Sequence, residues 1–208
     1  MAQKTTGLHS ILSAPWAYDL LQNALGARKA RNRLINEHAR PGPQVTVLDI
    51  GCGTGEIVPH LPRGVRYHGF DLSPAYVEAA TRRFGDRATF HCMDIADYQP
   101  DASAASAAPA DLVLAVGILH HLDDDIAIKL MASARAQLKT GGHLITMDGT
   151  LIEGQSSIAR RLILRDRGQN IREPEGYAAL ARHSFEEVDV TVRHDLLHVP
   201  YTHCVMEC

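Results

Sequence analysis

The sequence has few cysteines, no excess of basic residues and no long apolar run. Four cysteines in 208 residues are too few for a disulfide framework. The net charge of −3 argues against a nucleic-acid groove or an anionic membrane surface, because either partner would favour a basic excess. The first residues lack the apolar core of a signal peptide, and no later segment approaches the length of a membrane span. We therefore expect a cytoplasmic protein with neither a nucleic-acid nor a membrane partner, and both a monomer and a homodimer stay open.

Metal ligands are also poorly arranged, although the chain has twelve histidines. The densest cluster consists of His203, Cys204 and Cys208, in a segment typical of a β-strand. At about 3.3 Å per residue, Cys204 and Cys208 would lie roughly 13 Å apart, too far for one zinc ion. We expect small buried cysteines and surface histidines, and no metal.

What is present is the composition of one globular α/β domain. The apolar fraction of 45% and the charged fraction of 22% are ordinary, and 208 residues suit one domain with a full core. Apolar, β-branched runs alternate with helical patterns along the chain. The predicted strands are 45–50, 66–70, 88–93, 111–116, 143–147, 188–192 and 202–206, and helices are expected within 16–40, after Pro74, after Asp123 up to Gly141-Gly142, around 160–165 and after Pro174.

This alternation predicts βαβ units and a doubly wound, mostly parallel seven-stranded sheet. Only a few residues, around 198–201, separate the last two strands, whereas parallel neighbours need a long crossover. The final hairpin is therefore predicted to be antiparallel. Its turn would then lie at the edge where the parallel strands end, which is where such sheets bind ligands.

The strongest motif is the run VLDIGCGTG, residues 47–55, at the end of the first strand. Its glycines allow a positive φ and a close approach of the backbone to a ligand. The dinucleotide fingerprint would need a glycine at position 56, but the chain has Glu56 there, which would repel a pyrophosphate. A nicotinamide oxidoreductase is thereby disfavoured, whereas a cationic sulfonium ligand meets no such objection.

Acidic residues also end the next two strands. Asp71 can accept both hydroxyls of a ribose, and Asp94 can accept an adenine amino group. Each alone is better explained as a turn or capping residue. Together with the glycine turn, in this order, they favour an adenosyl ligand.

With these motifs the chain resembles the class I S-adenosylmethionine-dependent methyltransferases. The resemblance is carried by VLDIGCGTG, YHGFDLS, FHCMDIADY, DLVLAVGILHHLDD and LKTGGHLITMD, and it runs from about Tyr18 to Asp148. It implies a Rossmann-like methyltransferase fold with S-adenosyl-L-methionine as cofactor. The cofactor-binding residues that it implies are Tyr18, Asp49, Gly51, Cys52, Gly53, Gly55, Asp71, Leu72, Met93, Asp94, Ile95, Val116 and Gly117.

The acceptor side is less constrained. His121 follows the fourth strand and is our first candidate for a base or positioning group, although a structural role is an equal alternative. A similar run in phosphoethanolamine methyltransferases pairs a histidine with a tyrosine of the N-terminal helices, for which Tyr18 is the counterpart here. His120 is expected to be structural. Asp148, Tyr201, Thr202 and His203 are further candidates at the same edge.

We expect residues 1–208 to form a single domain, with 8–40 as a helical lid and 149–187 as an insertion on the acceptor side. Within that insertion, the polar segment 165–172 contains three arginines, which suggests an anionic or sugar-like acceptor. A solvated basic loop explains the same residues. The predicted function is methyl transfer to a small polar metabolite; the alternatives are cyclisation or aminocarboxypropyl transfer from the same cofactor, or a non-catalytic cofactor-binding module.

Overall fold

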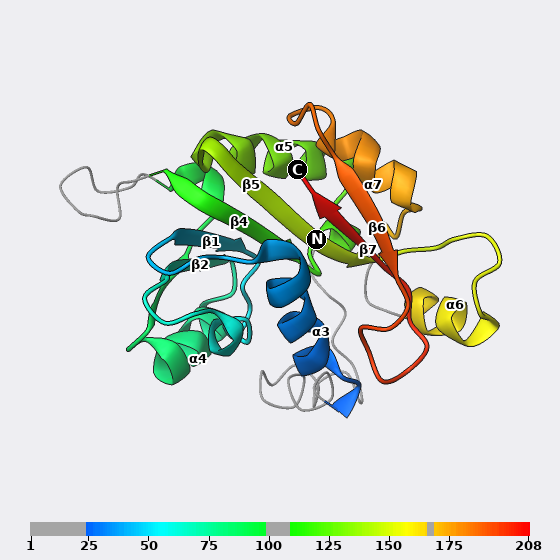
Figure 1. Cartoon of the computed structure of the whole chain (residues 1–208), viewed down its shortest axis with the longest axis horizontal. Helices are drawn as coiled ribbons and strands as arrows, with labels where there is room; N and C mark the ends of the chain where they lie inside the picture. Colours follow the sequence, from blue (N-terminus) through cyan, green and yellow to red (C-terminus); the bar gives the residue numbers. More distant parts are fainter. Residues whose placement is uncertain (1–23, 99–108, 166–168) are drawn as a thin grey trace.

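The computed structural model describes residues 24–98, 109–165 and 169–208 (Figure 1). Its centre is a seven-stranded sheet in the order β3-β2-β1-β4-β5-β7-β6. The strands are β1 (Thr46–Ile50), β2 (Arg66–Asp71), β3 (Ala88–Cys92), β4 (Ala110–Val116), β5 (Leu138–Gly149), β6 (Asp189–Arg193) and β7 (His203–Glu207). Strands β1 to β5 are parallel to one another, and β7 runs antiparallel to both β5 and β6. The predicted mostly parallel sheet with an antiparallel final hairpin is confirmed.

Helices cover both faces of this sheet (Figure 1). The described helices are α3 (Ala27–Arg33), α4 (Pro74–Phe84), α5 (Asp124–Gln137), α6 (Ser157–Leu164) and α7 (Pro174–Ala181), with a π-helical turn η1 (Leu34–Ala39) and 3-10 turns η2 (Val58–His60), η3 (Ile95–Asp97) and η5 (Leu119–His121). The Ser73 side chain caps α4 by accepting from the backbone N–H of Tyr76 at 3.4 Å, with Pro74 at the first helical position, as the sequence predicts. None of the helices in these ranges is long and apolar enough to span a membrane.

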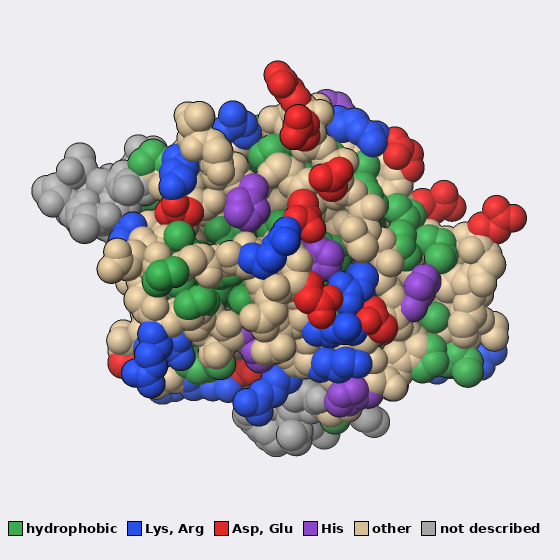
Figure 2. Space-filling view, in the orientation of Figure 1, with side chains coloured by type: hydrophobic (Ala, Val, Ile, Leu, Met, Phe, Trp, Pro, Cys, Tyr) green, Lys and Arg blue, Asp and Glu red, His purple; other side chains and the backbone are tan. Residues whose placement is uncertain are grey.

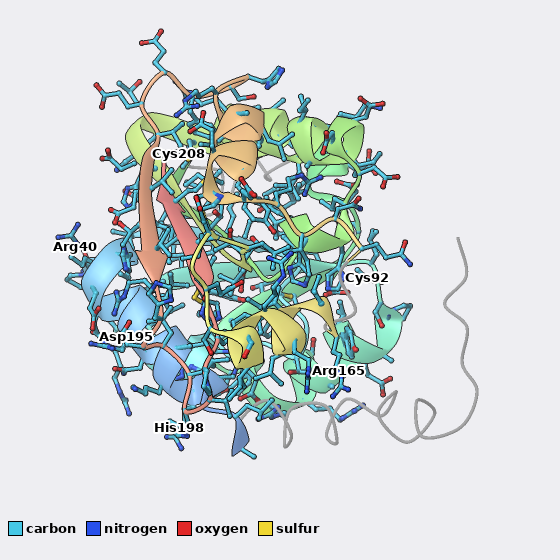
Figure 3. All side chains as sticks on the ribbon, turned by 90° about the vertical axis from the view of Figure 1, so that its right-hand side faces the viewer. Arg40, Cys92, Arg165, Asp195, His198 and Cys208 are labelled. Atoms are coloured by element: carbon cyan, nitrogen blue, oxygen red, sulfur yellow. The ribbon has the colours of Figure 1, made fainter. Side chains whose placement is uncertain are left out.

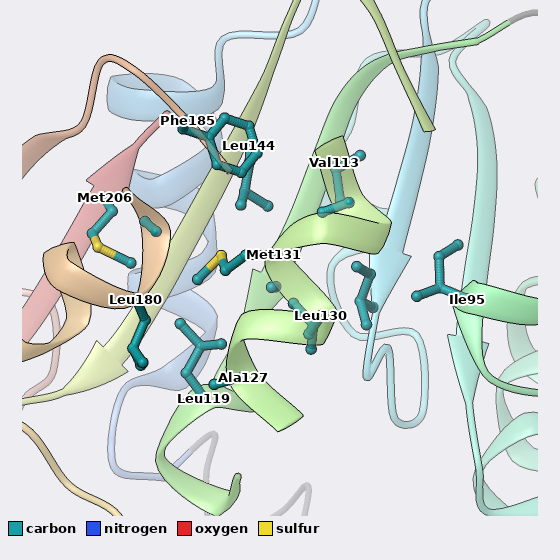
Figure 4. Close-up of a cluster of buried hydrophobic side chains, with 14 of the residues drawn as sticks. Ile95, Val113, Leu119, Ala127, Leu130, Met131, Leu144, Leu180, Phe185 and Met206 are labelled. Atoms are coloured by element: carbon teal, nitrogen blue, oxygen red, sulfur yellow. The ribbon is translucent and has the colours of Figure 1, made fainter. Parts of the chain in front are cut away.

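Each face of the sheet has its own apolar core. On the face covered by α5 and α7, Ala127, Leu130 and Met131 of α5 point toward Val113 and Leu144 of the sheet (Figure 4). On the other face, Ala30 of α3 and Leu34 and Ile35 of η1 cover Val47, Leu112 and Ile145. Burial on both faces explains why β1, β4 and β5 are continuous apolar runs rather than alternating ones.

One expected boundary is wrong. The sequence predicts that Gly141-Gly142 ends the helix and that the fifth strand starts at His143, but α5 ends at Gln137 and β5 begins at once with Leu138. Ala110 pairs with Leu138, and the register then shifts before Leu112 pairs with His143. The glycines lie within this irregular strand. Gly142 packs so closely on β4 that a Cβ there would lie 2.8 Å from the Ala110 carbonyl oxygen.

The connection between β6 and β7 spans residues 194–202, longer than predicted, and it lies along α3. Figure 3 shows its residues Asp195 and His198 beside that helix. The His198 N–H donates to the Leu25 carbonyl (2.9 Å), and Arg33 pairs with Asp195. Arg193 extends the network to Glu37 (2.8 Å) and to the buried His38, whose Nε2 lies 3.0 Å away. These interleaved charges over α3 (Figure 2) fix the helix to the hairpin.

Candidate functional site

The glycine turn after β1 has the backbone conformation that its sequence requires. Gly51, Gly53 and Gly55 have φ values of +73°, +54° and +75°, in the left-handed region that favours glycine. The N–H groups of Gly51 and Cys52 both donate to the Phe70 carbonyl of β2, at 2.8 and 3.0 Å. The turn is therefore fixed across the ends of β1 and β2.

The three glycines differ in what surrounds them. A Cβ at Gly51 would lie 2.6 Å from Ile118 Cδ1, and one at Gly55 would lie 2.9 Å from Phe90, so both positions are filled by protein. A Cβ at Gly53 would meet no atom of the described residues within 4 Å. Gly53 therefore forms an open cradle, in which a ligand can approach the backbone directly.

Asp71 at the end of β2 holds this cradle in place. Its Oδ2 accepts from the Gly53 N–H at 3.0 Å, and its Oδ1 accepts from the Ser73 N–H at 2.8 Å. The carboxylate thus joins the glycine turn to the start of α4. Its contact with a ribose stays a prediction.

Asp49 lies beneath the turn and is buried, with 4% of its surface exposed. Its Oδ2 accepts a hydrogen bond from the Tyr67 hydroxyl at 2.6 Å. Burial raises the pKa of Asp49 to about 7; the Tyr67 hydrogen bond and the charge of Arg31 oppose this shift, whereas Asp71 adds to it. Neither Tyr67 nor Arg31 is predicted as a site residue: Tyr67 lies in the motif YHGFDLS, in which only Asp71 and Leu72 have an expected role, and Arg31 lies in a segment with no motif.

Glu56 follows the turn, and no α-helix begins there among the described residues, whereas a dinucleotide site would bind its pyrophosphate at a helix N-terminus. The described chain passes through a turn into η2, Val58–His60. The Glu56 side chain is only 14% exposed and pairs with Arg83 of α4 and, at 3.9 Å, with Arg31 of α3. Its charge is therefore compensated by two arginines.

The predicted adenine side lies at the ends of β2 and β3. Asp94 is exposed and caps η3 by accepting from the Ala96 N–H at 2.9 Å. Ile95 is buried in the core, so its side chain supports this turn from below. Met93 is half-buried, and the apolar side chain of Leu72 is 72% exposed. Leu72 and Met93 offer apolar surface to a flat ring at this edge.

The end of β4 forms the wall of the candidate site opposite the ends of β2 and β3. Val116 is half-buried, and Gly117 is exposed with φ +70°. The neighbouring Ile118 packs on Gly51, so the wall and the glycine turn are in direct contact. A Cβ at Gly117 would lie 4.0 Å from Cε1 of His120, which places that ring beside the wall.

His120 and Asp148 form a buried pair at this edge. His120 Nδ1 lies 2.7 Å from Asp148 Oδ1, and the His120 backbone N–H donates to the same oxygen at 3.2 Å. The two residues are 7% and 2% exposed. Asp148 Oδ2 is buried with no hydrogen-bond partner among the described residues. His121 is exposed, and its ring packs on that of His120 at a centroid distance of 4.0 Å.

The start of β7 completes the edge. His203 is paired with Gly149, next to Asp148, and the ring of Tyr201 packs on His203 at 4.7 Å. Gly149 permits this arrangement, since a Cβ there would lie 2.5 Å from the Tyr201 hydroxyl oxygen. Thr202 is buried, and its Oγ1 lies 3.2 Å from Nδ1 of His194. The topology therefore brings Tyr201 and His203 to the edge at which Asp148 ends β5, as predicted, although the register pairs Asp148 with Cys204 and His203 with Gly149.

In the segment 165–172, Arg172 fits neither the solvated loop nor the acceptor contact that the sequence suggests. Arg172 is 12% exposed, and its guanidinium donates to Asp124 (2.6 and 3.0 Å) and to the carbonyls of Leu119, Leu122 and Asn170 (2.7–3.0 Å). Arg172 is thus a structural clamp, neither solvated nor directed at an acceptor. Arg165 is exposed, and Arg167 lies outside the described residues, as does the candidate Tyr18.

The cysteines contribute no disulfide and no metal centre to the described structure. All four are free thiols, and burial raises the pKa of Cys52 in the glycine turn above its ordinary value. Within the described ranges, no group of three or more His, Cys, Asp or Glu side chains is arranged to hold a metal ion. The charged groups at the site are therefore the carboxylates, imidazoles and arginines described above.

Comparison with known proteins agrees with this geometry. Residues 48–144 match a family model described as a methyltransferase domain. The chain belongs to the class I methyltransferases that depend on S-adenosylmethionine. It is 30% identical over 152 residues to indolepyruvate C-methyltransferase of Streptomyces griseus, and 29% identical over 146 residues to a highly reducing polyketide synthase of Emericella nidulans.

These matches cover 71% and 62% of this methyltransferase but only 44% and 6% of the two relatives, so the chain spans less than half of either. Among solved structures, human N-acetylserotonin methyltransferase in complex with SAM has a similar fold, with a TM-score of 0.68 at 18% identity. That match covers 94% of this chain and 55% of the human one. The predicted Rossmann-like methyltransferase fold is confirmed.

Proposed function

We propose that this protein transfers the methyl group of S-adenosylmethionine to a small organic acceptor that must lose a proton. The observation that carries the proposal is the buried His120–Asp148 pair, located beside Gly117 at the edge where the glycine turn and β4 meet. A proton acceptor at this place is needed only if the acceptor atom carries a proton, as a hydroxyl oxygen or a carbon next to a carbonyl does.

The cofactor side of the proposal follows from fit. S-adenosylmethionine supplies an electrophilic methyl group on a sulfonium sulfur. The open cradle at Gly53 suits the close approach of its methionine part, and Asp71 beside the cradle suits its ribose. Leu72, Met93 and Asp94 suit the adenine, and Val116 with Gly117 would form the inner wall. Tyr18 remains a proposed contact of the cofactor and acceptor.

We assign the role of base to His120 rather than to His121. With Nδ1 as the donor to the Asp148 carboxylate, the ring carries its lone pair on Nε2 and is held in one orientation. Asp148 also stabilises the imidazolium that forms when Nε2 accepts the acceptor's proton. His121 is exposed, and its ring packs on that of His120, so we give it a positioning role, together with Tyr201 and His203.

The class of acceptor rests on two considerations. The relatives include a C-methyltransferase of an α-keto acid and polyketide synthases, and carbon acids next to a carbonyl would use a base such as His120. The expectation of an anionic or sugar-like acceptor rests on three arginines, but one of them, Arg172, binds the Leu122 carbonyl and Asp124. We therefore propose a keto or hydroxyl compound as the acceptor. An anionic group in this compound is a further part of the proposal, and Arg165 and Arg167 are the arginines left to bind it. Residues 8–40 as a lid and 149–187 as the acceptor side are parts of the same proposal.

The test is product analysis by mass spectrometry. The protein is incubated with S-adenosylmethionine and an aryl α-keto acid, a β-ketoacyl thioester, a phenol or a hexose. S-adenosylhomocysteine together with a methylated keto or hydroxyl compound is the expected result. Methylthioadenosine in its place would indicate cyclisation or aminocarboxypropyl transfer, and affinity without turnover on the whole panel would indicate a non-catalytic module. Either outcome overturns the proposal.

A further inference from the structure

A partly buried arginine stands next to the acidic residues of the glycine turn. Arg31 projects from α3, and its side chain is only 15% exposed. Its guanidinium lies 3.9 Å from Glu56 Oε2 and acts electrostatically on the buried carboxyl of Asp49. α3 covers the same face of the sheet as Val47 and Tyr67, so Arg31 reaches the underside of the turn from that face.

The carboxyl groups around the turn mean that a cation is needed there to bind a carboxylate. Asp49, Glu56 and Asp71 place three carboxyl groups around the five residues Gly51–Gly55. The amino-acid end of the proposed cofactor carries an ammonium and a carboxylate. The carboxyl groups suit the ammonium and the sulfonium, but they repel the carboxylate unless a cation lies between them.

Two arginines are close enough to be considered. Arg83 pairs with Glu56 from α4, but its side chain is 46% exposed. Arg31 is the more buried of the two, and it is the one that acts on Asp49 as well as on Glu56. A guanidinium in this position presents paired donors that match both oxygens of a carboxylate.

We infer that Arg31 binds the α-carboxylate of the cofactor's methionine part, with Asp49 on the side of its ammonium. The inference rests on the proposed use of S-adenosylmethionine. It makes α3 a part of the cofactor site, held in place by its contacts to the β6–β7 loop at Asp195 and His198. It also accounts for an arginine that is largely withdrawn from water in a helix whose other basic side chains are more exposed.

The experiment compares two ligands that differ in the carboxylate alone. Calorimetry measures the Kd of S-adenosylhomocysteine and of its decarboxylated analogue, in which hydrogen replaces that group. The variants are Arg31→Met, Arg31→Lys and, as a matched control on the other side of Glu56, Arg83→Met. We expect the wild type to prefer S-adenosylhomocysteine by about ten- to a hundredfold, the range of one charge-assisted contact.

In Arg31→Met this preference should fall to within about twofold of unity, while the Kd of the decarboxylated analogue stays nearly constant and shows that the site is folded. Arg31→Lys should restore part of the preference, and Arg83→Met should keep it. Equal weakening of both ligands by Arg31→Met would show that Arg31 only supports the turn, and an unchanged preference would place the carboxylate elsewhere; both overturn the inference but leave the proposed function intact. A wild type that binds neither ligand would instead refute the proposed function.

Discussion

His120 contacts Asp148 twice, through its ring and through its backbone, although 28 residues separate them. Nδ1 lies 2.7 Å from Asp148 Oδ1, and the backbone N–H donates to that oxygen at 3.2 Å. The double contact fixes both the position of η5 and the direction of the imidazole. The pair also holds the ring next to Gly117, at the wall of the proposed cofactor site.

The first prediction concerns this pair. Asp148→Asn should lower kcat by about 10²- to 10⁴-fold, because the amide no longer holds the required tautomer or stabilises the imidazolium. His120→Ala should have a similar effect, and the Kd of S-adenosylhomocysteine should change by less than about threefold in both. His121→Ala is the neighbouring control, for which we expect a reduction of less than about tenfold.

A second readout separates a base from a structural residue. The loss caused by His120→Ala should shrink as the acceptor becomes more acidic, because an acceptor that ionises in solution needs no base. A series of substituted acceptors, assayed with wild type and variant, measures this trend. A constant loss across the series, or a larger loss in His121→Ala, would contradict the assignment.

The second prediction uses the raised pKa of Asp49. Burial holds this pKa near 7 in the folded, unliganded protein, against about 3.9 in an unfolded chain. Between these values the folded state binds a proton that the unfolded state lacks, so this group lowers the free energy of unfolding as pH rises from about 4 to 7, and the loss persists above. Asp49→Asn should remove that slope.

Urea denaturation at pH 4.5, 6 and 8 provides the measurement. Asp49→Asn should be more stable than wild type at pH 8, by at most about 4 kcal/mol, and the difference should shrink to about 1 kcal/mol at pH 4.5. Glu153→Gln, at an exposed loop position, is the control and should leave the pH dependence unchanged. Parallel pH profiles of wild type and Asp49→Asn would show that Asp49 is ionised throughout.

The parts of this structure that depend on local sequence could be predicted. The β-branched runs predict the strands, and the glycines of residues 51–55 predict the turn with positive φ. The final connection is too short for a parallel crossover, so it predicts the antiparallel hairpin. The position of Asp71 beside the glycine turn could be predicted for the same reason, because the ends of parallel strands meet at one edge of the sheet.

What could not be predicted depends on contacts between distant segments. Two adjacent histidines in LHH look equivalent in sequence, and only the packing of η5 against β5 decides that His120 faces inward. Likewise, the double glycine after α5 is typical of a helix end, but the bulged pairing with Ala110 draws it into β5. Arg31 and Arg172 lie in segments that look solvated, and each is withdrawn from water by acceptors more than 20 residues away.

The third prediction concerns Asp71. Asp71→Ala should weaken the binding of S-adenosylhomocysteine, because the ribose would lose charge-assisted hydrogen bonds of about 1.5–3 kcal/mol each. The change also removes the acceptor of the Gly53 N–H, so the turn itself should loosen. Asp71→Asn keeps one acceptor oxygen and should fall between wild type and Asp71→Ala in calorimetry. An unchanged Kd in both variants would rule out the ribose contact.

The fourth prediction decides between the structural and the acceptor-binding roles of Arg172. Arg172→Met would leave Asp124 and the carbonyls of Leu119 and Leu122 without their donor, in the loop that carries His120. We expect a loss of about 2–4 kcal/mol in the free energy of unfolding, measured by urea denaturation. Arg165→Met, at an exposed position, is the matched control and should change that free energy by less than about 0.5 kcal/mol. If Arg172→Met instead kept its stability and raised only the KM of an acidic acceptor, Arg172 would bind the acceptor, and the anionic class would return to first place.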